Sequence, residues 1–287
     1  MMKMVGRFVF VVLLMGTIAQ ATPKPATFCR FVPERKDDFA WENDKVAFRV
    51  YGPALKSASE DSGIDCWLKR VDYPIVNKWY RESETLNKSY HKDHGEGYDG
   101  YKVGSSRGCG GLGLWINGEL KTSNVFTKWR IVKCTDAKSE FVLTYEWTVG
   151  ADVYKEEKRI SILLGDRLFK VVSTFWKNGS LALKLPVAVG VARHAGAAVV
   201  SKDLKRGWVA CWELIDGSGL GTAVVMNPTN MKEVVVKKDH VLLITSTDGK
   251  GQVCYYAGYG WARAGEIKTL AEWQAYLTQF AMKKFKK

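Results

Sequence analysis

A glycine-rich segment from residue 90 to 111 gathers the side chains best suited to chemistry. It contains two of the chain's four histidines, three tyrosines and an arginine, among them His91, His94, Tyr98, Tyr101 and Arg107. Histidine titrates near neutral pH, tyrosine acts as an acid or base beside a cation, and arginine binds a carboxylate bidentately. The segment therefore predicts acid–base catalysis, with these five side chains as the catalytic candidates. A surface loop whose histidines only cap turns is the alternative.

The same segment contains residue types that bind metal ions. His91 and His94, together with Asp93, Glu96 and Asp99, offer imidazole and carboxylate donors, which suit Zn²⁺ or Ca²⁺. The H-x-x-H spacing lacks the further fixed ligand of a zinc signature. We therefore expect no required cofactor, with Ca²⁺ or Zn²⁺ as the alternative.

A second polar group occupies residues 35–44, where a tryptophan stands among charged side chains. An aromatic face covers the C–H side of a sugar ring, while carboxylates and amides bind its hydroxyls. A histidine that follows a later strand also suits a cleft. The predicted substrate-binding residues are Arg35, Asp38, Trp41, Glu42, Arg49, Glu96 and His194. A core tryptophan beside a turn of solvated charges, and a purely structural histidine, are the alternatives.

The first residues predict export. An apolar run from Phe8 to Met15 follows Lys3 and Arg7 and is far shorter than the roughly 20 residues needed to span a bilayer. Small residues before position 22 fit signal peptidase, so we expect residues 1–21 to be a signal peptide and the mature protein to be periplasmic or secreted, without membrane insertion. Six cysteines permit disulfides there, although their spacing does not give the pairing.

The chain is strongly basic, with a formal net charge of +13. Basic proteins attract polyanions, and export removes nucleic acid as the expected partner. We therefore expect an acidic oligosaccharide or polysaccharide. Scattered lysines that merely solvate the surface are the alternative.

Hydrophobic alternation predicts an all-β fold, a large antiparallel β sandwich. Short breaks at residues 150–152, 165–166 and 178–179 predict hairpins, so residues 140–192 read as a meander of antiparallel strands. The predicted strands are residues 46–51, 125–133, 140–149, 153–164, 167–176, 181–192, 208–214, 222–226, 241–246 and 252–259.

One helix is predicted to close the chain. Thr269 and Glu272 have capping-box spacing, and an apolar stripe follows at helical intervals. No internal repeat or linker divides the sequence, so residues 22–287 are expected to form a single β-sandwich domain.

Four segments resemble a known family, the domain of unknown function 4861. They are residues 35–55, 63–80, 90–111 and 255–277, of which HKDHGEGYDGYKVG is the most specific part. The resemblance implies a carbohydrate-active protein of Bacteroidetes polysaccharide utilisation, in a family that includes an ulvan oligosaccharide dehydratase. It also implies a sandwich like that of galactose mutarotases and polysaccharide lyases.

These lines together favour β-elimination at a uronic acid, by dehydration or by lyase cleavage. A base removes the C5 proton, a cation stabilises the charge that develops on the adjacent carboxylate, and an acid protonates the departing C4 oxygen. The candidates are Arg107, Arg35 or Arg49 for the cation, His94 or Tyr101 for the base, and His91 or Tyr98 for the acid. Hydrolysis by paired carboxylates, epimerisation, and glycan binding without catalysis are the alternatives.

Overall fold

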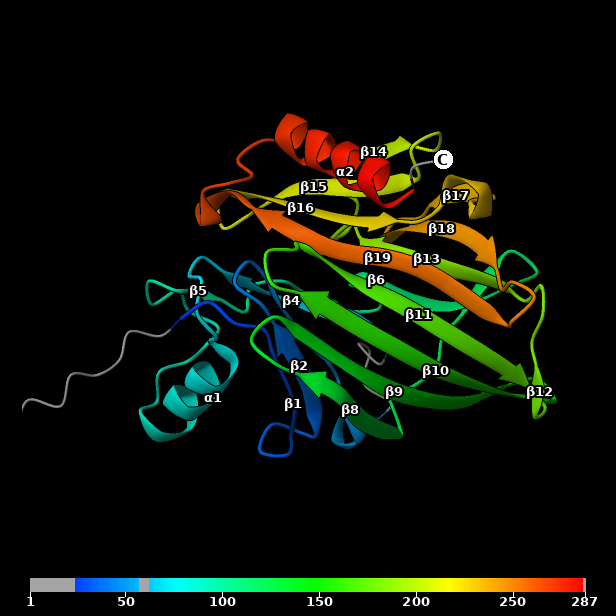
Figure 1. Cartoon of the computed structure of the whole chain (residues 1–287), viewed down its shortest axis with the longest axis horizontal. Coiled ribbons are helices and arrows are strands. Elements are labelled where there is room, and N and C mark those ends of the chain that lie inside the picture. The colour runs from blue at the N-terminus through cyan, green and yellow to red at the C-terminus, as the bar shows by residue number, and fades with distance from the viewer. Residues whose placement is uncertain (1–23, 57–61, 286–287) are drawn as a thin grey trace, which may run out of the picture.

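Two layers of antiparallel sheet form the protein (Figure 1). The computed structural model describes residues 24–56 and 62–285. The predicted signal peptide lies outside these residues. Within them, no helix is both long and apolar enough to cross a membrane.

The first layer is a nine-stranded sheet. Its strands run side by side in the order β14-β15-β16-β19-β11-β10-β9-β8, with β12 paired to β11. The bounds are β8 Lys128–Cys134, β9 Lys138–Val149, β10 Asp152–Leu163, β11 Leu168–Lys177, β12 Ser180–Leu181, β14 Val199–Asp203, β15 Trp208–Ile215, β16 Ser218–Val225 and β19 Gln252–Trp261.

Two five-stranded sheets make up the second layer, joined by a parallel bridge between Ile64 and Gly108. Residues of all three sheets share one hydrophobic core. The N-terminal sheet contains β1 Phe28–Val32, β2 Asp38–Glu42, β3 Ala47–Val50, β4 Ile64–Lys69 and β5 Gly97–Tyr98. The other contains β17 Glu233–Val236, β18 His240–Ser246, β13 Pro186–Ala192, β6 Cys109–Ile116 and β7 Glu119–Lys121.

Alternation of side chains explains the long strands. Phe141, Leu143 and Tyr145 of β9 point into the core and are at most 1% exposed, because every second side chain of a strand faces the same side. The neighbouring strand β10 pairs with β9 along its whole length. The predicted antiparallel sandwich is confirmed.

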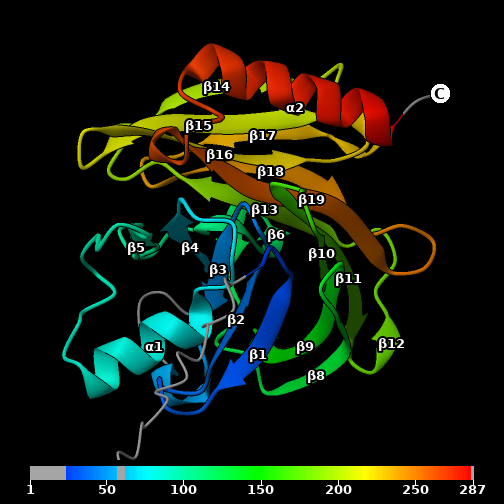
Figure 2. The ribbon, with the colours of Figure 1, turned by 60° about the vertical axis from the view of Figure 1, so that its left-hand side comes forward.

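Two α-helices cover the outer faces of different layers (Figure 2). Helix α2, Leu270–Lys284, begins with the predicted capping box, and its buried Trp273 and Leu277 pack over β15 and β16. Helix α1, Val76–Thr85, lies on the N-terminal sheet, where Trp79 stacks on Trp67 at 5.5 Å between ring centroids. Short 3₁₀ helices occupy Pro53–Leu55, Pro228–Asn230 and Ala262–Ala264.

Two elements differ from the sequence-based prediction. Helix α1 was not predicted, and β6 begins at Cys109, inside the glycine-rich segment of residues 90–111. Residues 181–192 are not one strand of the meander, because β12 ends at Leu181 and the chain then crosses to β13 in the other layer.

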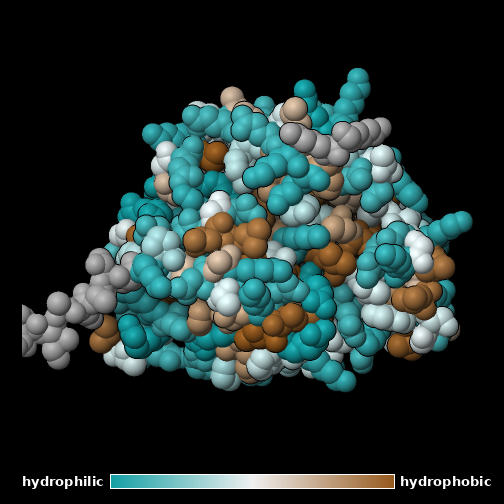
Figure 3. All heavy atoms as spheres, in the orientation of Figure 1, coloured by the Kyte–Doolittle hydropathy of each residue, from teal (hydrophilic) through white to brown (hydrophobic). Residues whose placement is uncertain are grey.

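Hydrophilic side chains dominate the face shown in Figure 3, with small, separate hydrophobic patches between them. A large continuous apolar patch would mark a protein or membrane interface. The apolar side chains on this face therefore form no single large patch.

Candidate functional site

A cluster of charged side chains lies on the face of the N-terminal sheet that points away from the main core. Along β3, Phe48 enters that core, so the next residue, Arg49, takes the opposite face. Arg49 stands directly across from Asp65 of β4, and Asp38 starts the neighbouring strand β2. We call Arg49 with Asp38, Asp65 and Asp99 the Arg49 cluster.

The guanidinium of Arg49 holds the three carboxylates together. Its Nη2 donates to Oδ2 of Asp65 at 2.6 Å and to Oδ2 of Asp99 at 3.1 Å, while its Nη1 lies 3.7 Å from Oδ2 of Asp38. The Arg49 side chain is 6% exposed and lies 5.3 Å from the ring centroid of Trp67. Such a buried cation requires nearby negative charge, which these aspartates supply.

Burial perturbs two of these carboxyl groups. It raises the pKa of Asp38 to about 6, and the nearby Arg49 charge opposes this shift only in part. Burial also raises the pKa of Asp99 above its usual value, again against the Arg49 charge. Perturbed pKa values of this kind are common at functional sites and also occur in structural ion networks.

His91, Tyr90 and Arg35 form the rim of the Arg49 cluster, where His91 is exposed, Arg35 is half-buried and Tyr90 is buried. Nδ1 of His91 lies 3.3 Å from the backbone oxygen of Asp99 and 3.4 Å from its Oδ2, while the His91 side chain is 55% exposed. The imidazole and Tyr90 rings are 4.4 Å apart. Nε of Arg35 donates to the Tyr90 hydroxyl at 2.8 Å. The structure thus brings together the candidates His91, Arg35, Asp38 and Arg49.

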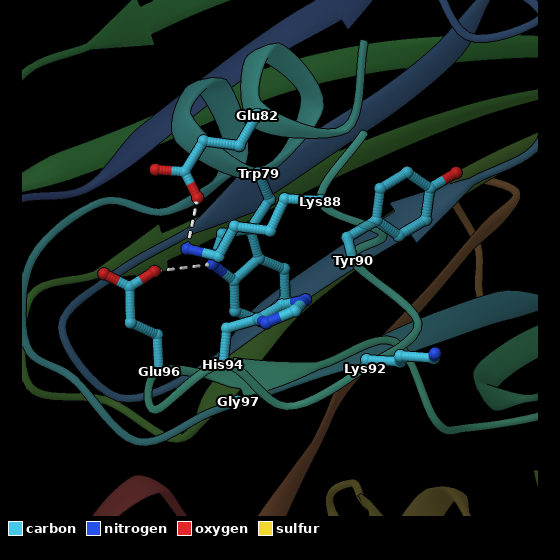
Figure 4. A pocket seen from close by; sticks show the side chains of 8 residues that line it. All are labelled: Trp79, Glu82, Lys88, Tyr90, Lys92, His94, Glu96 and Gly97. Atoms are coloured by element: carbon cyan, nitrogen blue, oxygen red, sulfur yellow. Dashed lines mark hydrogen bonds and ion pairs between the residues drawn. The ribbon is translucent and has the colours of Figure 1, made fainter. Parts of the chain in front are cut away.

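His94 points to a small hollow beside α1, which Tyr90 also lines (Figure 4). Its Nε2 lies 3.1 Å from the backbone oxygen of Ser89. Glu96 accepts a hydrogen bond from Trp79 Nε1 at 3.0 Å and pairs with Lys78 at 2.8 Å. Burial alone would raise the pKa of Glu96, but the contact with Lys78 outweighs it and the pKa is lowered. The hollow is small, about 10 Å³, which suits about one water molecule.

Tyr101 and His194 meet on another side of the glycine-rich segment. Their rings pack edge to face at 4.8 Å. His194 contacts Glu213 Oε1 through Nδ1 at 2.7 Å and the Lys102 backbone oxygen through Nε2 at 2.6 Å. Burial would lower the pKa of His194, but these two acceptors outweigh it and raise the pKa. His194 therefore fastens the segment to β15 with both ring nitrogens.

Tyr98 and Arg107 are also separated from the rim. The Tyr98 hydroxyl donates to Asp216 Oδ2 at 2.7 Å, and burial together with that contact raises its pKa. Arg107 is 2% exposed and donates to Ser62 Oγ at 2.9 Å. Arg107, one of the predicted cations, therefore lies in the interior and not with the loop histidines. It is buried because β6 begins two residues later, at Cys109, and enters the sandwich there.

Trp41 and Glu42 are corrections to the predicted sugar site. Trp41 is fully buried among the aromatic rings between the layers, so it is closed to a saccharide. Glu42 is fully buried on the opposite face, where its carboxylate accepts from the backbone N–H groups of Ile75 and Val76 and pairs with Lys69. It fixes the start of α1.

Sequence reasoning missed the partners that complete the site. Asp65 was not identified as a candidate. Its position between Ile64 and Cys66, in an otherwise apolar strand, could have indicated an unusual buried charge. Tyr90 was read only as the start of the glycine-rich segment. Its hydroxyl contact with Arg35 joins positions that are 55 residues apart, which spacing alone does not show.

The suggested metal ligands do not converge. His91 and His94 face different partners, and Asp93 Oδ1 contacts Arg70 Nη2 at 3.0 Å. Across residues 24–56 and 62–285, no group of three or more His, Cys, Asp and Glu side chains is arranged to hold a metal ion.

Fold and site together define a β-sandwich protein with a charged, partly open site on its N-terminal sheet. The model of the family described as "Domain of unknown function (DUF4861)" matches residues 10–286, and the chain belongs to this family. A protein of Formosa agariphila named "Uncharacterized protein P7" is 35% identical over 271 residues, which cover 89% of this chain and 67% of that protein.

A solved structure of an alpha-galactosidase from Lactobacillus brevis aligns with 85% of this chain and 42% of its own length. The TM-score is 0.35 and the sequence identity is 8%. A likeness this slight supports no argument about function.

Proposed function

We propose that the protein is an exported carbon–oxygen lyase that performs β-elimination at a uronic acid of an acidic oligosaccharide, such as one from ulvan. The main support is the rim of the Arg49 cluster. There the ring of the exposed His91 contacts Tyr90, and Tyr90 accepts a hydrogen bond from Arg35. A base, a cation and a proton donor thus lie next to one another, with His91 exposed, Arg35 half-buried and Tyr90 buried. The resemblance to a family with an oligosaccharide dehydratase and the net charge of +13 support an acidic sugar.

His91 is the proposed base. An Nδ1–H that donates to Asp99 leaves the lone pair of Nε2 free to accept a proton. Asp99 is in turn held by Arg49, which fixes the orientation of the acceptor. This base–orienter pair has the geometry that general-base catalysis requires.

Arg35 and Tyr90 are the proposed cation and acid. Nε of Arg35 donates to the Tyr90 oxygen, so its two terminal nitrogens remain for the substrate carboxylate. Because the Tyr90 oxygen accepts in this contact, its own proton remains available for donation. The neighbouring guanidinium also stabilises negative charge on that oxygen.

The proposed reaction balances without an external reagent. His91 Nε2 takes the C5 proton, and the electrons of the C5–H bond form the C4–C5 double bond. The C4–O bond breaks, its electrons leave with the oxygen, and Tyr90 supplies the proton. Water then carries the proton from His91 back to Tyr90. A hydroxyl leaving group makes the step a dehydration, and a glycosidic oxygen makes it a lyase cleavage.

Paired-carboxylate hydrolysis has less support from the geometry. Asp38 and Asp99 are bound up with Arg49, Glu42 caps α1, and Glu96 is bound to Trp79 and Lys78. None of the four is an exposed carboxyl group, whereas a hydrolase needs one beside a water molecule.

The test uses uronate-ended oligosaccharides with residues 22–287 of the protein. We expect near-ultraviolet absorbance to rise as the unsaturated sugar forms, with loss of one water in mass for dehydration or shorter products for cleavage. His91→Gln and Tyr90→Phe should each lower kcat by about 10² to 10⁴-fold. His94→Gln is the matched control, since it removes the other exposed histidine of the same loop, and it should keep full turnover.

Two results would contradict the proposal. One is unchanged absorbance across the oligosaccharide set while binding remains detectable, which favours a glycan-binding or epimerising protein. The other is full turnover by folded His91→Gln, which removes His91 as the base.

A further inference from the structure

A second pocket contacts the loop that carries the proposed base. It has a volume of about 400 Å³ and is bounded by the β2–β3 turn, the connection from β4 to α1, and the segment before α2. Arg70 lines it and binds Asp93 of the glycine-rich segment at 3.0 Å. Because Asp93 stands two residues after His91, this pocket adjoins the loop that carries the proposed base.

The pocket wall contains a buried arginine with unused hydrogen-bonding capacity. Arg167 is 3% exposed, and its Nη2 donates to Glu266 Oε2 at 2.7 Å. Its Nη1 is buried and has no hydrogen-bond partner among the described residues. Leaving a buried charged donor unpaired is costly, so such groups usually serve a ligand or a bound water.

The structure itself shows a carboxylate in this pocket. The Glu266 side chain is 53% exposed, yet Arg167 and Lys45 both pair with its carboxylate. These two cations come from turns of different layers, so the fold assembles a two-point carboxylate clamp. The exposed Glu266 carboxylate now occupies the clamp. A ligand oxyanion would displace Glu266 and bind Arg167 and Lys45.

Charge and size suit an acidic sugar unit. The lining includes four cationic side chains, Lys45, Lys69, Arg70 and Arg167, against three carboxylates, Asp44, Asp72 and Glu266. Lys69 is saturated by three acceptors and Arg70 pairs with Asp93, so a ligand anion would bind Lys45 and Arg167 by displacing the exposed Glu266. A volume of about 400 Å³ is within the range of small-ligand sites.

We propose that this pocket binds the carboxylate group of a second acidic sugar in the same oligosaccharide as the uronic acid that reacts. The inference rests on the proposed function only for the saccharide nature of the ligand. It predicts that the enzyme prefers oligosaccharides with two acidic units over those with one. Asp44 and Asp72 supply acceptors for the hydroxyls of the same sugar.

Calorimetric titration of the intact protein tests the pocket. The probes are glucuronic acid, glucose and inorganic sulfate, each at low and high salt. We expect glucuronic acid to bind, glucose to bind far more weakly, and affinity for glucuronic acid to fall as salt rises. Lys45→Gln should weaken glucuronate binding by about tenfold to a hundredfold. Glu266→Gln should strengthen it, since the internal competitor loses its charge.

Arg81→Gln is the matched control, because Arg81 is an exposed arginine on α1 outside the pocket. It should bind glucuronic acid as the unchanged protein does. Thermal unfolding of each variant checks the fold, and Glu266→Gln provides the test if Lys45→Gln fails to fold. Unchanged glucuronate affinity in a folded pocket variant overturns the proposal, as does equal binding of sulfate and glucuronate, which indicates a site for inorganic anions.

The outcomes for the two proposals are separable. His91→Gln should lower kcat by about 10² to 10⁴-fold and keep glucuronate binding in the pocket. If no oligosaccharide is turned over but Lys45→Gln still loses glucuronate binding, the pocket assignment stands and the elimination falls. If turnover depends on His91 while Lys45→Gln binds glucuronate normally, the elimination stands and the pocket assignment falls.

Discussion

Asp38→Asn should remove a pH-dependent loss of stability. Asp38 is fully buried, Gly52 donates its backbone N–H to Oδ1 at 3.1 Å, and Oδ2 has no hydrogen-bond partner among the described residues. The carboxylate therefore loses its hydration with incomplete compensation from Arg49. Its pKa rises from 3.8 to about 6 in the folded protein.

The sign follows from proton linkage. Between pH 4 and 6 the folded state binds more protons at Asp38 than the unfolded state does, so the free energy of unfolding falls as pH rises. A rise of about two pKa units corresponds to about 3 kcal/mol of stability lost across this window. The asparagine in Asp38→Asn does not titrate, so the free energy of unfolding of this variant should not fall between pH 4 and 6 for this reason.

Urea unfolding at several pH values measures the effect. The control is Asp37→Asn, which changes the neighbouring aspartate, whose backbone φ of 60° suits asparagine. It should keep the fall in stability between pH 4 and 6. The reasoning is refuted if Asp38→Asn and the unchanged protein show the same pH dependence in that window.

Two further predictions concern Trp41 and His194. Trp41→Ala should lower the free energy of unfolding by about 3–5 kcal/mol in denaturant titration, because Trp41 is fully buried between the layers; a change below 1 kcal/mol would contradict its place in the core. His194→Gln should remove stability that the charged imidazole contributes. Because the pKa of His194 is raised by its contacts with Glu213 and the Lys102 carbonyl, which outweigh burial, that contribution is full below pH 6.5 and is lost as pH rises through the folded pKa. Equal pH dependence in the variant and the unchanged protein would exclude it.

The sheet and the last helix were predictable because their signals are local. Alternation along β9 places Phe141 and Leu143 in the core, and the Thr269–Glu272 capping box starts α2 where expected. Helix α1 gave no such signal. Its N-cap residue, Ile75, has no capping side chain, and the buried backbone N–H groups at the start of the helix are satisfied by Glu42 from a distant strand.

The candidate site was predictable in its residue types but not in its grouping. His91, Arg35 and Arg49 were named from their chemistry, and the structure places them in one area. Arg107 stands in the same glycine-rich segment but follows a different path, since β6 begins at Cys109 and carries it into the sandwich. Residues that are close in sequence can therefore lie far apart in space where a loop enters a strand.

The position of β19 has a consequence for biosynthesis. This strand, Gln252–Trp261, lies in the middle of the nine-stranded sheet, with β11 on one side and β16 on the other. A growing chain that has not yet reached Gln252 holds two partial sheets, each with an unpaired edge of backbone donors and acceptors. Such edges readily pair with other chains. The large sheet can close only after nearly the whole described chain has been made, so chaperone protection of the nascent polypeptide matters most just before β19 appears.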